Sequence, residues 1–472
     1  MTFEHVKKTV NNINFPIFTF KLISLIMITI ISLFCAGRSE SANLAPFKYG
    51  ITSSATEYAN SGRRSLDKNR ILVFDYGKAY SSLGKWHNPF FIARYAHALY
   101  NDWYKTNCTD DNLKNDFLLQ AKFLLSSYKE ERKGMAYWIY PFENTYFGAK
   151  PGWISGIGQS LIAGVLLRAY EITGNQDFEN IAKKAIEVYF HPMSSGGVVT
   201  SGEMGLWIQE VASPDCKGFC ILNGHITGLL GLIDIANLTS DKKVYDVVTR
   251  GIATVRNHLH DFDAGFSSFY SLKVKDGDQP IIAPRNGYNA LHVWQLEKLF
   301  EITKKPEFLH AAILFKKYEE LKDIRNAKGS TNPNTHGPDE AAGWFGNRYW
   351  SHNKFPTYYE VHMASEEALE GVFIGAHFQK AAPLSLSVSL FQNDKWIKIW
   401  STEKNIQKDI FLSFSNPVLA SAIRVDIYSD NGNKNVALNA VMPMRRLKSV
   451  SANYDRPVVT LSTLVPGFRK ND

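Results

Sequence analysis

A pattern that recurs three times constrains the fold of this chain more than any other feature of its sequence. In each copy a helix ends at a threonine, a turn follows, and a second helix begins with an aromatic residue; the copies span residues 169–185, 234–251 and 299–315. The aromatic anchors Phe178, Tyr245 and Phe308 are 67 and 63 residues apart. Because a single helical hairpin cannot bury its apolar face alone, such hairpins stack on their neighbours. The repeat therefore predicts an (α/α) toroid of helical hairpins over residues 80–325.

Long loops precede the first helix of each hairpin. They span residues 134–153, 191–223 and 261–288. Loops in equal phase emerge on the same rim of a toroid, and loops held by a rigid scaffold commonly carry function. We therefore expect five loop side chains to converge on one mouth: Trp138, Trp153, Glu210, Tyr270 and Tyr288.

The pattern changes at about residue 330. Residues 331–356 are rich in Gly, Pro, Asn and Trp, and the segments after them alternate apolar and polar residues with period two. Turn signals separate these segments, notably at residues 392–394 and 430–432. We expect an all-β sandwich (jelly roll) over residues 331–446 and a basic tail over 447–472. With residues 44–79 as an N-terminal arm or linker, the chain is expected to be multidomain, with an α part and a β part.

The N-terminus is typical of an export segment. Three lysines precede an apolar run over residues 22–36, and small and polar residues follow it. The run is short for a transmembrane helix, but the basic leader is long, so residues 1–43 are expected to be a signal peptide or a membrane anchor. The protein would then be secreted, periplasmic, at the cell surface, or anchored in the secretory pathway.

Composition and residue spacing limit the classes of ligand and partner that we expect. The net charge of +8 favours an acidic partner, but no Lys/Arg run typical of nucleic-acid arms occurs, so we expect no nucleic acid. In an exported chain Cys216 and Cys220 could close a small loop, leaving Cys108 free. His225 and His292, just inside predicted helix starts, are typical of packed or capping histidines. The histidines have no metal-ligand spacing and no phosphate or dinucleotide fingerprint is present, so we expect neither a metal nor a cofactor.

Three loop residues are candidates for proton transfer. Glu210 has apolar neighbours at positions 207, 208 and 211, and burial among them would raise its pKa and suit it to acid/base work. Tyr270 and Tyr288 each lie three residues from a cation, Lys273 and Arg285 respectively. A cation can hold a substrate carboxylate or lower the pKa of a phenol.

A set of motifs in order carries a resemblance to a known family. The motifs are Gly152-Trp153 with Gln159, Ala169-Tyr170, Trp207 with Glu210, Leu222-Asn223-Gly224, Phe269-Tyr270-Ser271-Leu272, and Tyr288 with His292 and Gln295-Leu296. In order and approximate spacing, over about residues 80–325, they resemble the C-terminal catalytic domain of D-glucuronyl C5-epimerase. The resemblance implies a toroid that binds a heparan- or heparosan-type polyuronide and inverts D-glucuronate to L-iduronate at C5. Such chemistry needs acid/base groups on both faces of the sugar, because a proton leaves one face and returns to the other.

Carried over by position, the resemblance implies that Glu210, Tyr270 and Tyr288 are catalytic. Two positions depart from the family: Val211 replaces a tyrosine, and Lys273 replaces an arginine. The family's β-barrel before the helical domain is also missing. Trp138 and Trp153 are expected to line sugar subsites, and Lys273 and Arg285 to hold the uronate carboxylate. The full set of residues implied for substrate binding is Trp138, Trp153, Gln159, Trp207, Asn223, Lys273, Arg285 and His292.

The C-terminal stretch has a second resemblance. Residues 348–353, 356–361, 371–374 and 422–428 are similar to segments of discoidin-like (factor 5/8 type C) sandwiches. This resemblance implies an accessory role in glycan binding or in packing.

Three hypotheses follow. The first is an exported uronosyl C5-epimerase, an isomerase that acts on an acidic polysaccharide without a cofactor. The second is a polyuronide β-elimination lyase, which shares the abstraction at C5 but loses a leaving group at C4. The third is a non-catalytic glycan-binding protein on an epimerase scaffold, which the valine at position 211 favours. A homodimer stays open in each case.

Overall fold

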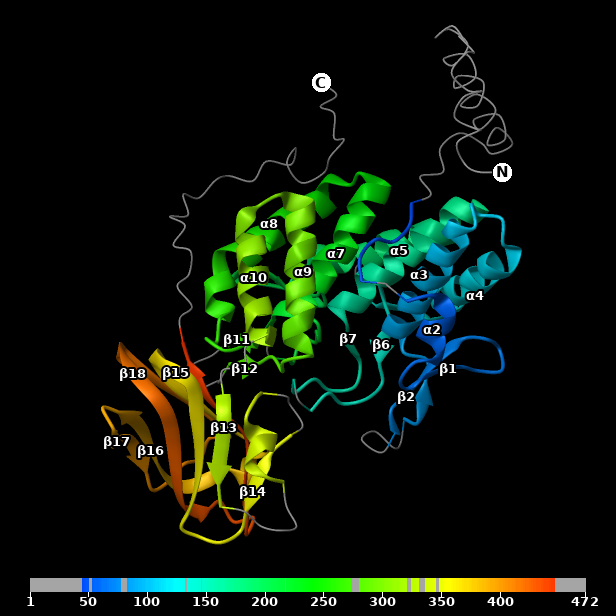
Figure 1. The fold of residues 1–472 in the computed structure, drawn as a ribbon. Helices are drawn as coiled ribbons and strands as arrows, with labels where there is room; N and C mark the ends of the chain where they lie inside the picture. The colour runs from blue at the N-terminus through cyan, green and yellow to red at the C-terminus, as the bar shows by residue number, and fades with distance from the viewer. Residues whose placement is uncertain are drawn as a thin grey trace, which may run out of the picture.

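The computed structural model describes residues 45–50, 53–77, 83–131, 134–145, 147–216, 218–272, 280–320, 324–330, 336–344 and 348–445 (Figure 1). The expected leader (residues 1–43), the expected tail (residues 447–472) and Lys273 lie outside these described residues. In the described part of the chain, no helix combines the length and the apolar character needed to cross a membrane.

The helices between residues 89 and 320 pair into four consecutive hairpins, and this part is called the helical region below. The pairs are α3 (Pro89–Lys105) with α4 (Asp111–Ser127), α5 (Gly156–Thr173) with α6 (Gln176–Glu187), α7 (Leu222–Thr239) with α8 (Lys242–His258), and α9 (Tyr288–Thr303) with α10 (Pro306–Glu320). The last three pairs are the three copies of the sequence repeat, so the prediction of stacked helical hairpins is confirmed. The closed toroid stays a prediction.

The turn inside each repeat copy has one hydrogen-bond pattern. A threonine hydroxyl donates to the carbonyl four residues earlier and accepts from the backbone N–H two residues later, in Thr173, Thr239 and Thr303. The residue after each threonine has a left-handed backbone, at Gly174, Ser240 and Lys304. This geometry caps the carbonyl end of the first helix and reverses the chain into the second. The threonine of the repeat is therefore the residue that makes the hairpin turn.

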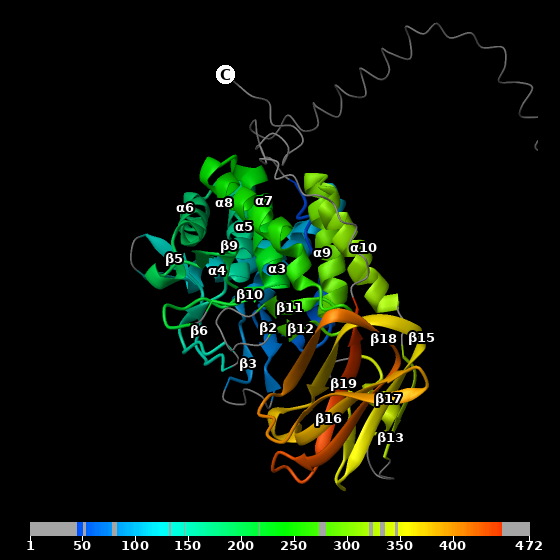
Figure 2. The same ribbon diagram turned by 90° about the vertical axis from the view of Figure 1, so that its left-hand side faces the viewer.

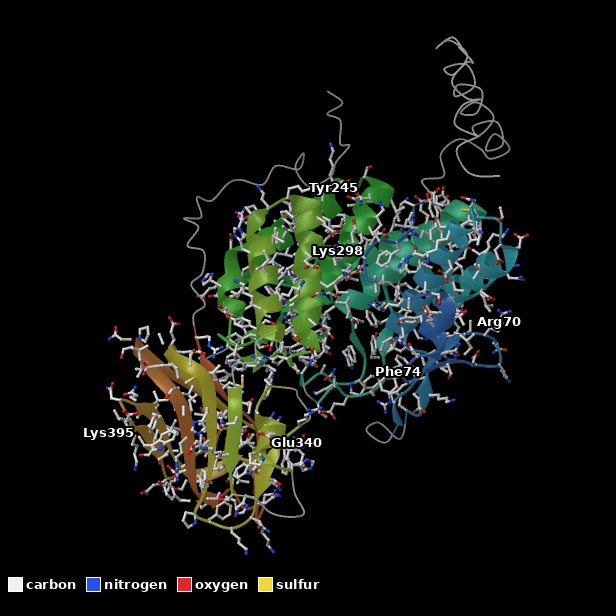
Figure 3. The ribbon with its side chains drawn as sticks, in the orientation of Figure 1. Arg70, Phe74, Tyr245, Lys298, Glu340 and Lys395 are labelled. Carbon is white, nitrogen blue, oxygen red and sulfur yellow. The ribbon has the colours of Figure 1, made fainter. Side chains whose placement is uncertain are left out.

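The first helix of each hairpin is the inner one. Nearly every residue of α5 and α7 is buried, because both sequences are apolar or small on all sides. Their partners α6 and α8 bury one stripe and expose their charged residues. Tyr245, at the start of the outer helix α8, lies at one end of the helical region. The antiparallel sheet formed by the chain after residue 324 lies at the opposite end (Figure 3). The hairpin turns are thus at the far end, and the N-termini of the inner helices face the sheet.

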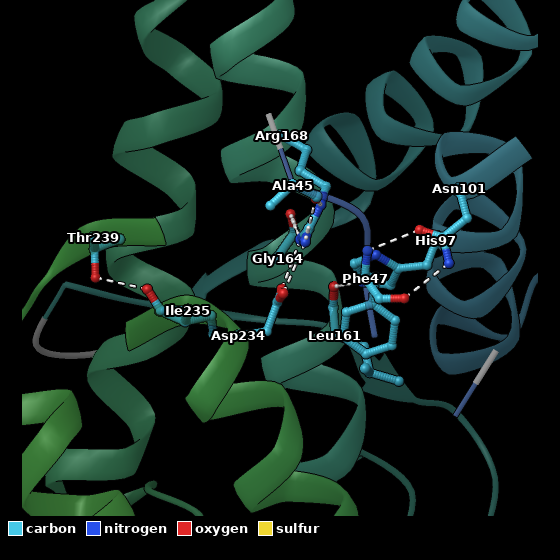
Figure 4. A network of polar contacts seen from close by, with 10 residues as sticks. All are labelled: Ala45, Phe47, His97, Asn101, Leu161, Gly164, Arg168, Asp234, Ile235 and Thr239. Carbon is cyan, nitrogen blue, oxygen red and sulfur yellow. Dashed lines mark hydrogen bonds and ion pairs between the residues drawn. The ribbon is translucent and has the colours of Figure 1, made fainter. Parts of the chain in front are cut away.

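A buried ion pair joins α5 to α7. Arg168 donates from two nitrogens to the two oxygens of Asp234, at 2.6 and 2.8 Å (Figure 4). The same guanidinium donates to the carbonyl of Ala45. Asn101 of α3 forms two further hydrogen bonds with the backbone of Phe47, each 2.8 Å long. The segment of residues 45–50 is therefore bonded to two inner helices, α3 and α5.

The stretch expected to be an arm or linker is folded. It contains α2 (Ala55–Asn60), β1 (Arg64–Leu66) and β2 (Leu72–Asp75), and β2 pairs with β3 (Lys85–Trp86). Tyr58 and Leu72 are buried in the core of the helical region. The backbone N–H of Ala55 donates to Asp102 of α3, and that of Leu72 to Gln120 of α4. These contacts hold the stretch in place. Its few buried positions follow no periodic pattern, so the sequence did not indicate that it is folded.

Short antiparallel strands build the loops that precede the inner helices. They are β4 (Lys129–Glu131), β5 (Met135–Tyr137), β6 (Ile139–Tyr140), β7 (Trp153–Ile154), β8 (Val199–Gly202), β9 (Gly205–Ile208), β10 (Cys220–Ile221), β11 (Phe269–Leu272) and β12 (Ile281–Ile282). β6 pairs with β7, β8 with β9, and β11 with both β10 and β12. The loops are therefore braced from within.

Residues 324–445 form the C-terminal β-region, an antiparallel sheet with a buried core of its own. Its strands are β13 (Ile324–Gly329), β14 (Trp350–His352), β15 (Thr357–Ala376), β16 (Pro383–Gln392), β17 (Lys395–Thr402), β18 (Asp409–Asp430) and β19 (Val436–Met444). The order is β14-β19-β15-β18-β16-β17, and β13 pairs with β15. The predicted turn between β16 and β17 has positive φ at Asn393 and Asp394, as a tight hairpin requires. The sheet begins at residue 324, earlier than the 331 predicted, because β13 pairs with the long strand β15.

The C-terminal β-region packs on the loop of residues 261–288 (Figure 2). The rings of Phe266 and Phe373 stack with centroids 5.4 Å apart. The backbone N–H of Arg285 donates to the carbonyl of Trp344 at 3.0 Å. The β-region thus supports the loop that carries Tyr270 and leads into Tyr288.

Candidate active site

A cavity of about 690 Å³ lies among the inner helices. Its wall takes residues from the first turns of α3, α5, α7 and α9, and at depth it reaches Phe47, Tyr49 and Gly50 of the N-terminal segment. Aromatic rings and a few polar side chains dominate the wall, which is the composition expected of a small-molecule or sugar site.

Four helix N-termini meet at this cavity. Asn88 and Ser155 cap α3 and α5 with their side chains, and both line the wall. Within the described residues, α7 and α9 begin without a side-chain cap. Each N-terminus carries the partial positive charge of its helix dipole, and at α7 and α9 no side chain among the described residues caps the first N–H groups, so the cavity favours an anion.

Glu210 lies in the wall just after β9. Its Oε2 is enclosed and, among the described residues, has no hydrogen-bond partner. Burial raises the pKa of the carboxyl to about 7. The side chain is held against the start of α7, where a Cβ added to Gly224 would come within 2.6 Å of Oε2. A carboxyl in this state can take up and release a proton near neutral pH.

Two more wall residues each carry a buried side-chain oxygen that has no hydrogen-bond partner among the described residues. The oxygens are Oδ1 of Asn223 and Oε1 of Gln295. The amide of Gln295 is oriented by its donation to the Asn223 carbonyl and to Thr227. Because buried acceptors are rarely left unpaired, these oxygens and Glu210 Oε2 together indicate a ligand that brings several hydroxyl donors.

Tyr288 and Tyr270 pack together at the edge of the cavity. Their ring centroids are 4.7 Å apart in an edge-to-face arrangement. Tyr288, the first residue of α9, lines the cavity and is 44% exposed. Burial and the charge of Glu210 both raise the pKa of its phenol. Tyr270, on β11, is buried behind it in an apolar cluster with Val211 and Trp153. The structure therefore brings Glu210 and Tyr288 to one cavity, with Tyr270 as the ring that supports Tyr288.

The tryptophans expected in the sugar site separate into two kinds. Trp153 lines the cavity, and its indole N–H donates to the Phe142 carbonyl at 2.8 Å. Trp138 is buried in the core, where its N–H donates to the Leu124 carbonyl, and it is not among the residues that line the cavity, so its place in a sugar subsite stays a prediction. Trp207 is also in the core, stacked on His225.

Three other residues expected to bind substrate lie outside the cavity lining, and their role in substrate binding stays a prediction. Gln159 is buried and bridges the backbone at Ala136 and Trp138. Arg285 is buried and donates to the Phe266 carbonyl, beside the C-terminal β-region rather than in the cavity wall. His292 accepts or donates at Ser268 over 2.7 Å, and burial lowers its pKa to about 3, so it stays neutral. Asn223, in contrast, lines the cavity as expected.

The sequence reading missed Tyr140, Tyr76 and Asn88. Tyr140 lies in β6, lines the cavity, and stacks on Trp153 with centroids 3.9 Å apart. Tyr76 and Asn88 line the wall beside it. A signal was available for Tyr140, because it lies in the loop of residues 134–153 that we placed on the rim.

The described residues contain neither the disulfide considered in the sequence analysis nor a cluster of metal-ligating side chains. Cys216 and Cys220 form no disulfide with each other within the described residues, so the small disulfide loop is absent there. The Cys216 thiol contacts the Phe147 carbonyl at 3.0 Å. In the part of the chain that the structure describes, no cluster of three His, Cys, Asp or Glu residues could hold a metal ion.

Comparison with known proteins agrees with the resemblance seen in the sequence. Residues 131–317 match the model of the D-glucuronyl C5-epimerase C-terminus. These residues belong to that domain family. The match contains three of the inner helices, and it includes Glu210, Tyr270 and Tyr288.

Two curated relatives match part of the chain. D-glucuronyl C5-epimerase of Caenorhabditis elegans is 27% identical over 184 residues, which are 35% of this chain and 29% of that protein. An uncharacterised protein of Methanocaldococcus jannaschii is 29% identical over 137 residues, 28% of this chain and 44% of that protein. The chain therefore spans less than half the length of either relative.

Solved carbohydrate-binding modules are similar to about a quarter of the chain. The family 32 module of C. perfringens NanJ, solved with galactose, is 11% identical, with a TM-score of 0.23, and covers 25% of this chain and 90% of that one. A pectin-binding module is 17% identical, with a TM-score of 0.23, and covers 26% of this chain and 93% of that one.

Proposed function

We propose that the protein inverts D-glucuronate to L-iduronate at C5 within an acidic polysaccharide of the heparosan or heparan type. The observation that carries the proposal is a group of three residues, Glu210 among them, that line one cavity and each hold a buried side-chain oxygen with no partner among the described residues, in a region that matches the D-glucuronyl C5-epimerase C-terminus. Asn223 and Gln295 would accept hydrogen bonds from sugar hydroxyls, and Trp153 would give the sugar an apolar face.

In the first half of the reaction, Tyr288 and Glu210 are assigned different roles in moving the C5 proton. The hydroxyl oxygen of Tyr288 takes the proton from C5 as its own proton passes to the carboxylate of Glu210. The electron pair of the C5–H bond moves into the substrate carboxyl group, which becomes a dianion. The N-termini of α7 and α9 stabilise this added charge, because their first-turn N–H groups carry partial positive charge. This replaces the role expected of Arg285.

The test is hydrogen exchange in deuterated water with unsulfated glucuronate polymers, followed by NMR at C5. Deuterium together with iduronate is the expected result. Glu210→Gln and Tyr288→Phe should each lower turnover by about a hundredfold or more, the usual size of an acid/base contribution. Glu203→Gln, an exposed carboxyl on the turn between β8 and β9, is the matched control and should keep full turnover.

Other outcomes separate the alternatives. Absorbance from an unsaturated uronate would indicate elimination at C4 in place of inversion. Glycan binding with no exchange at C5 would indicate a non-catalytic binding protein. Full activity in Glu210→Gln and Tyr288→Phe would overturn the assignment of both residues.

The C-terminal β-region is proposed as an accessory glycan-binding part. Tyr349 stacks on His377 with centroids 4.2 Å apart, and the neighbouring Phe378 is 43% exposed. Such rings suit the apolar face of a sugar. Export, a membrane anchor and a homodimer stay predictions.

A further inference from the structure

Inversion at C5 needs a second proton-transferring group, on the face of the sugar away from Tyr288. The residue after Glu210 cannot supply it, because Val211 lines the cavity with an aliphatic side chain. The wall beside Val211 does hold a phenol. Tyr140 and Val211 belong to the same apolar cluster, and both line the cavity.

We propose that Tyr140 is an acid/base residue that works on the face of the sugar opposite Tyr288. The inference rests on the proposed function and deepens it. Tyr140 comes from β6, which pairs with β7 ahead of α5, whereas Tyr288 begins α9. The two phenols therefore enter the cavity from different elements.

The charge of Glu210 affects the pKa values of both phenols. Its charge acts on the pKa of Tyr140 and on that of Tyr288, and it raises both. Burial is the larger cause in each case. One carboxyl therefore acts electrostatically on a phenol from each of the two elements, and the proposal assigns to it the proton exchange with both.

The surroundings of the Tyr140 hydroxyl suit a group that gives up a proton for a short time. The hydroxyl donates to Oδ1 of Asn88 at 3.3 Å, which is long for an O–H···O hydrogen bond and leaves the proton able to turn toward a substrate. A Cβ added to Gly158, in the first turn of α5, would lie 3.7 Å from the same oxygen. The oxygen thus lies near the N-termini of both α3 and α5, which stabilise a transient phenolate.

At rest the group is a neutral phenol. Burial raises the pKa of Tyr140, so the proton stays on the oxygen until a strong base accepts it. The ring is fixed by its stacking on Trp153, with an interplanar angle of 12°. A neutral, oriented phenol is a suitable general acid for a carbanion-like centre.

The full cycle balances. After Tyr288 has taken the C5 proton and Glu210 has accepted the proton of Tyr288, the Tyr140 hydroxyl gives its proton to the opposite face of C5. The electron pair returns from the substrate carboxyl group to form the new C5–H bond. Tyr140 is then a phenolate and Glu210 a carboxylic acid, and the proton of Glu210 passes to Tyr140. The reverse reaction begins with abstraction by Tyr140.

The test compares exchange with inversion in Tyr140→Phe, which removes the hydroxyl and keeps the ring. With a glucuronate polymer in deuterated water, this variant should still incorporate deuterium at C5 but form iduronate about a hundredfold more slowly or worse. With an iduronate-containing polymer, its exchange should be lost. Tyr288→Phe should show the opposite preference. Tyr95→Phe is the control, because Tyr95 is a buried phenol of α3 outside the cavity wall, and it should behave as the unmodified protein.

A rescue strengthens the test. Val211→Tyr in the Tyr140→Phe background places a phenol in the same part of the wall, and it should restore part of the inversion. A purely structural role for Tyr140 would lower exchange on both polymers together and would overturn the inference. So would iduronate formation within about threefold of the unmodified rate in Tyr140→Phe. An unmodified protein that neither exchanges nor inverts any glucuronate polymer overturns the proposed function itself, and this outcome is seen before any variant is made.

Discussion

Replacing Asp234 by asparagine tests how much the buried ion pair contributes to stability. The change keeps the shape of the side chain but removes its charge. Arg168 and Asp234 have side-chain exposures of 1% and 9%, so the guanidinium would be left charged and enclosed. Its remaining acceptors are backbone carbonyls, at Ala45 and Gly164.

The expected magnitude follows from this burial. Removing one partner of a buried pair costs about 3–5 kcal/mol, because the other charge loses its compensation. At about 2–4 °C of melting temperature per kcal/mol, the variant should melt roughly 6–20 °C lower. The exposed pair of Arg250 and Asp246, with side-chain exposures of 54% and 63%, is the matched control. Asp246→Asn should cost less than about 1 kcal/mol.

Thermal unfolding of the two variants is the main assay. Hydrogen exchange adds a local one, since the Phe47 amide, held by Asn101, should lose protection in Asp234→Asn as the segment of residues 45–50 loosens (Figure 4). The double variant Arg168→Met with Asp234→Leu should recover most of the stability, because it removes both charges. Equal melting temperatures for Asp234→Asn and Asp246→Asn would refute the reasoning.

Three further predictions concern the site. The pKa of Glu210, raised to about 7, predicts that kcat/KM rises with pH through about pH 7 and then reaches a plateau. It also predicts that the free energy of unfolding falls between about pH 4.5 and 7, because the folded state keeps this proton to a higher pH than the unfolded state. Glu210→Gln should remove that fall in a pH series of melting curves. Gly224→Ala should lower turnover at least tenfold while leaving the fold intact, because its Cβ would displace Glu210, whereas Gly202→Ala, with open space at its Cβ, should be neutral in the same assay. Arg285→Met should lower the melting temperature by removing donors to the Phe266 carbonyl and should leave KM unchanged, whereas a raised KM would restore its expected role in substrate binding.

The helical repeat was predictable because its signals are local. The threonine at the end of each first helix bonds the carbonyl four residues earlier in the same helix. Because this contact is local, three copies of the turn could be predicted from the sequence. The phase of the loops then placed Glu210 and Tyr288 on one rim, and both line the cavity. The polar stretch before residue 80 was not predictable in this way, because Tyr58 and Leu72 have no periodic companions, and the stretch is fixed by hydrogen bonds from Ala55 to α3 and from Leu72 to α4.

The expected site residues that lie outside the cavity lining have partners that are distant in sequence. Arg285 was placed in the site because it precedes Tyr288 by three residues, yet its backbone is bound to Trp344 of a later segment. Trp138 and Tyr140 are two residues apart in one loop, and only the tyrosine is in the cavity wall. The pairing of β6 with β7 decides this, since it sets Tyr140 beside Trp153. No spacing within the loop encodes that pairing.

The direction of the hairpins explains why the candidate chemistry lies at one end of the helical region. Each inner helix begins at the cavity, and α5, α7 and α9 end at a threonine turn on the far side, so four positive helix ends lie around the same space. The loops that precede these helices are also the ones that carry Glu210, Tyr140 and Tyr270. Had the same residues been placed on the hairpin turns, Glu210 would face the negative ends of the inner helices. A substrate carboxylate that gains charge during the reaction would then be destabilised. Under the proposed function, the cavity end is therefore the end of the helical region at which an acidic sugar and its extra charge would be stabilised together.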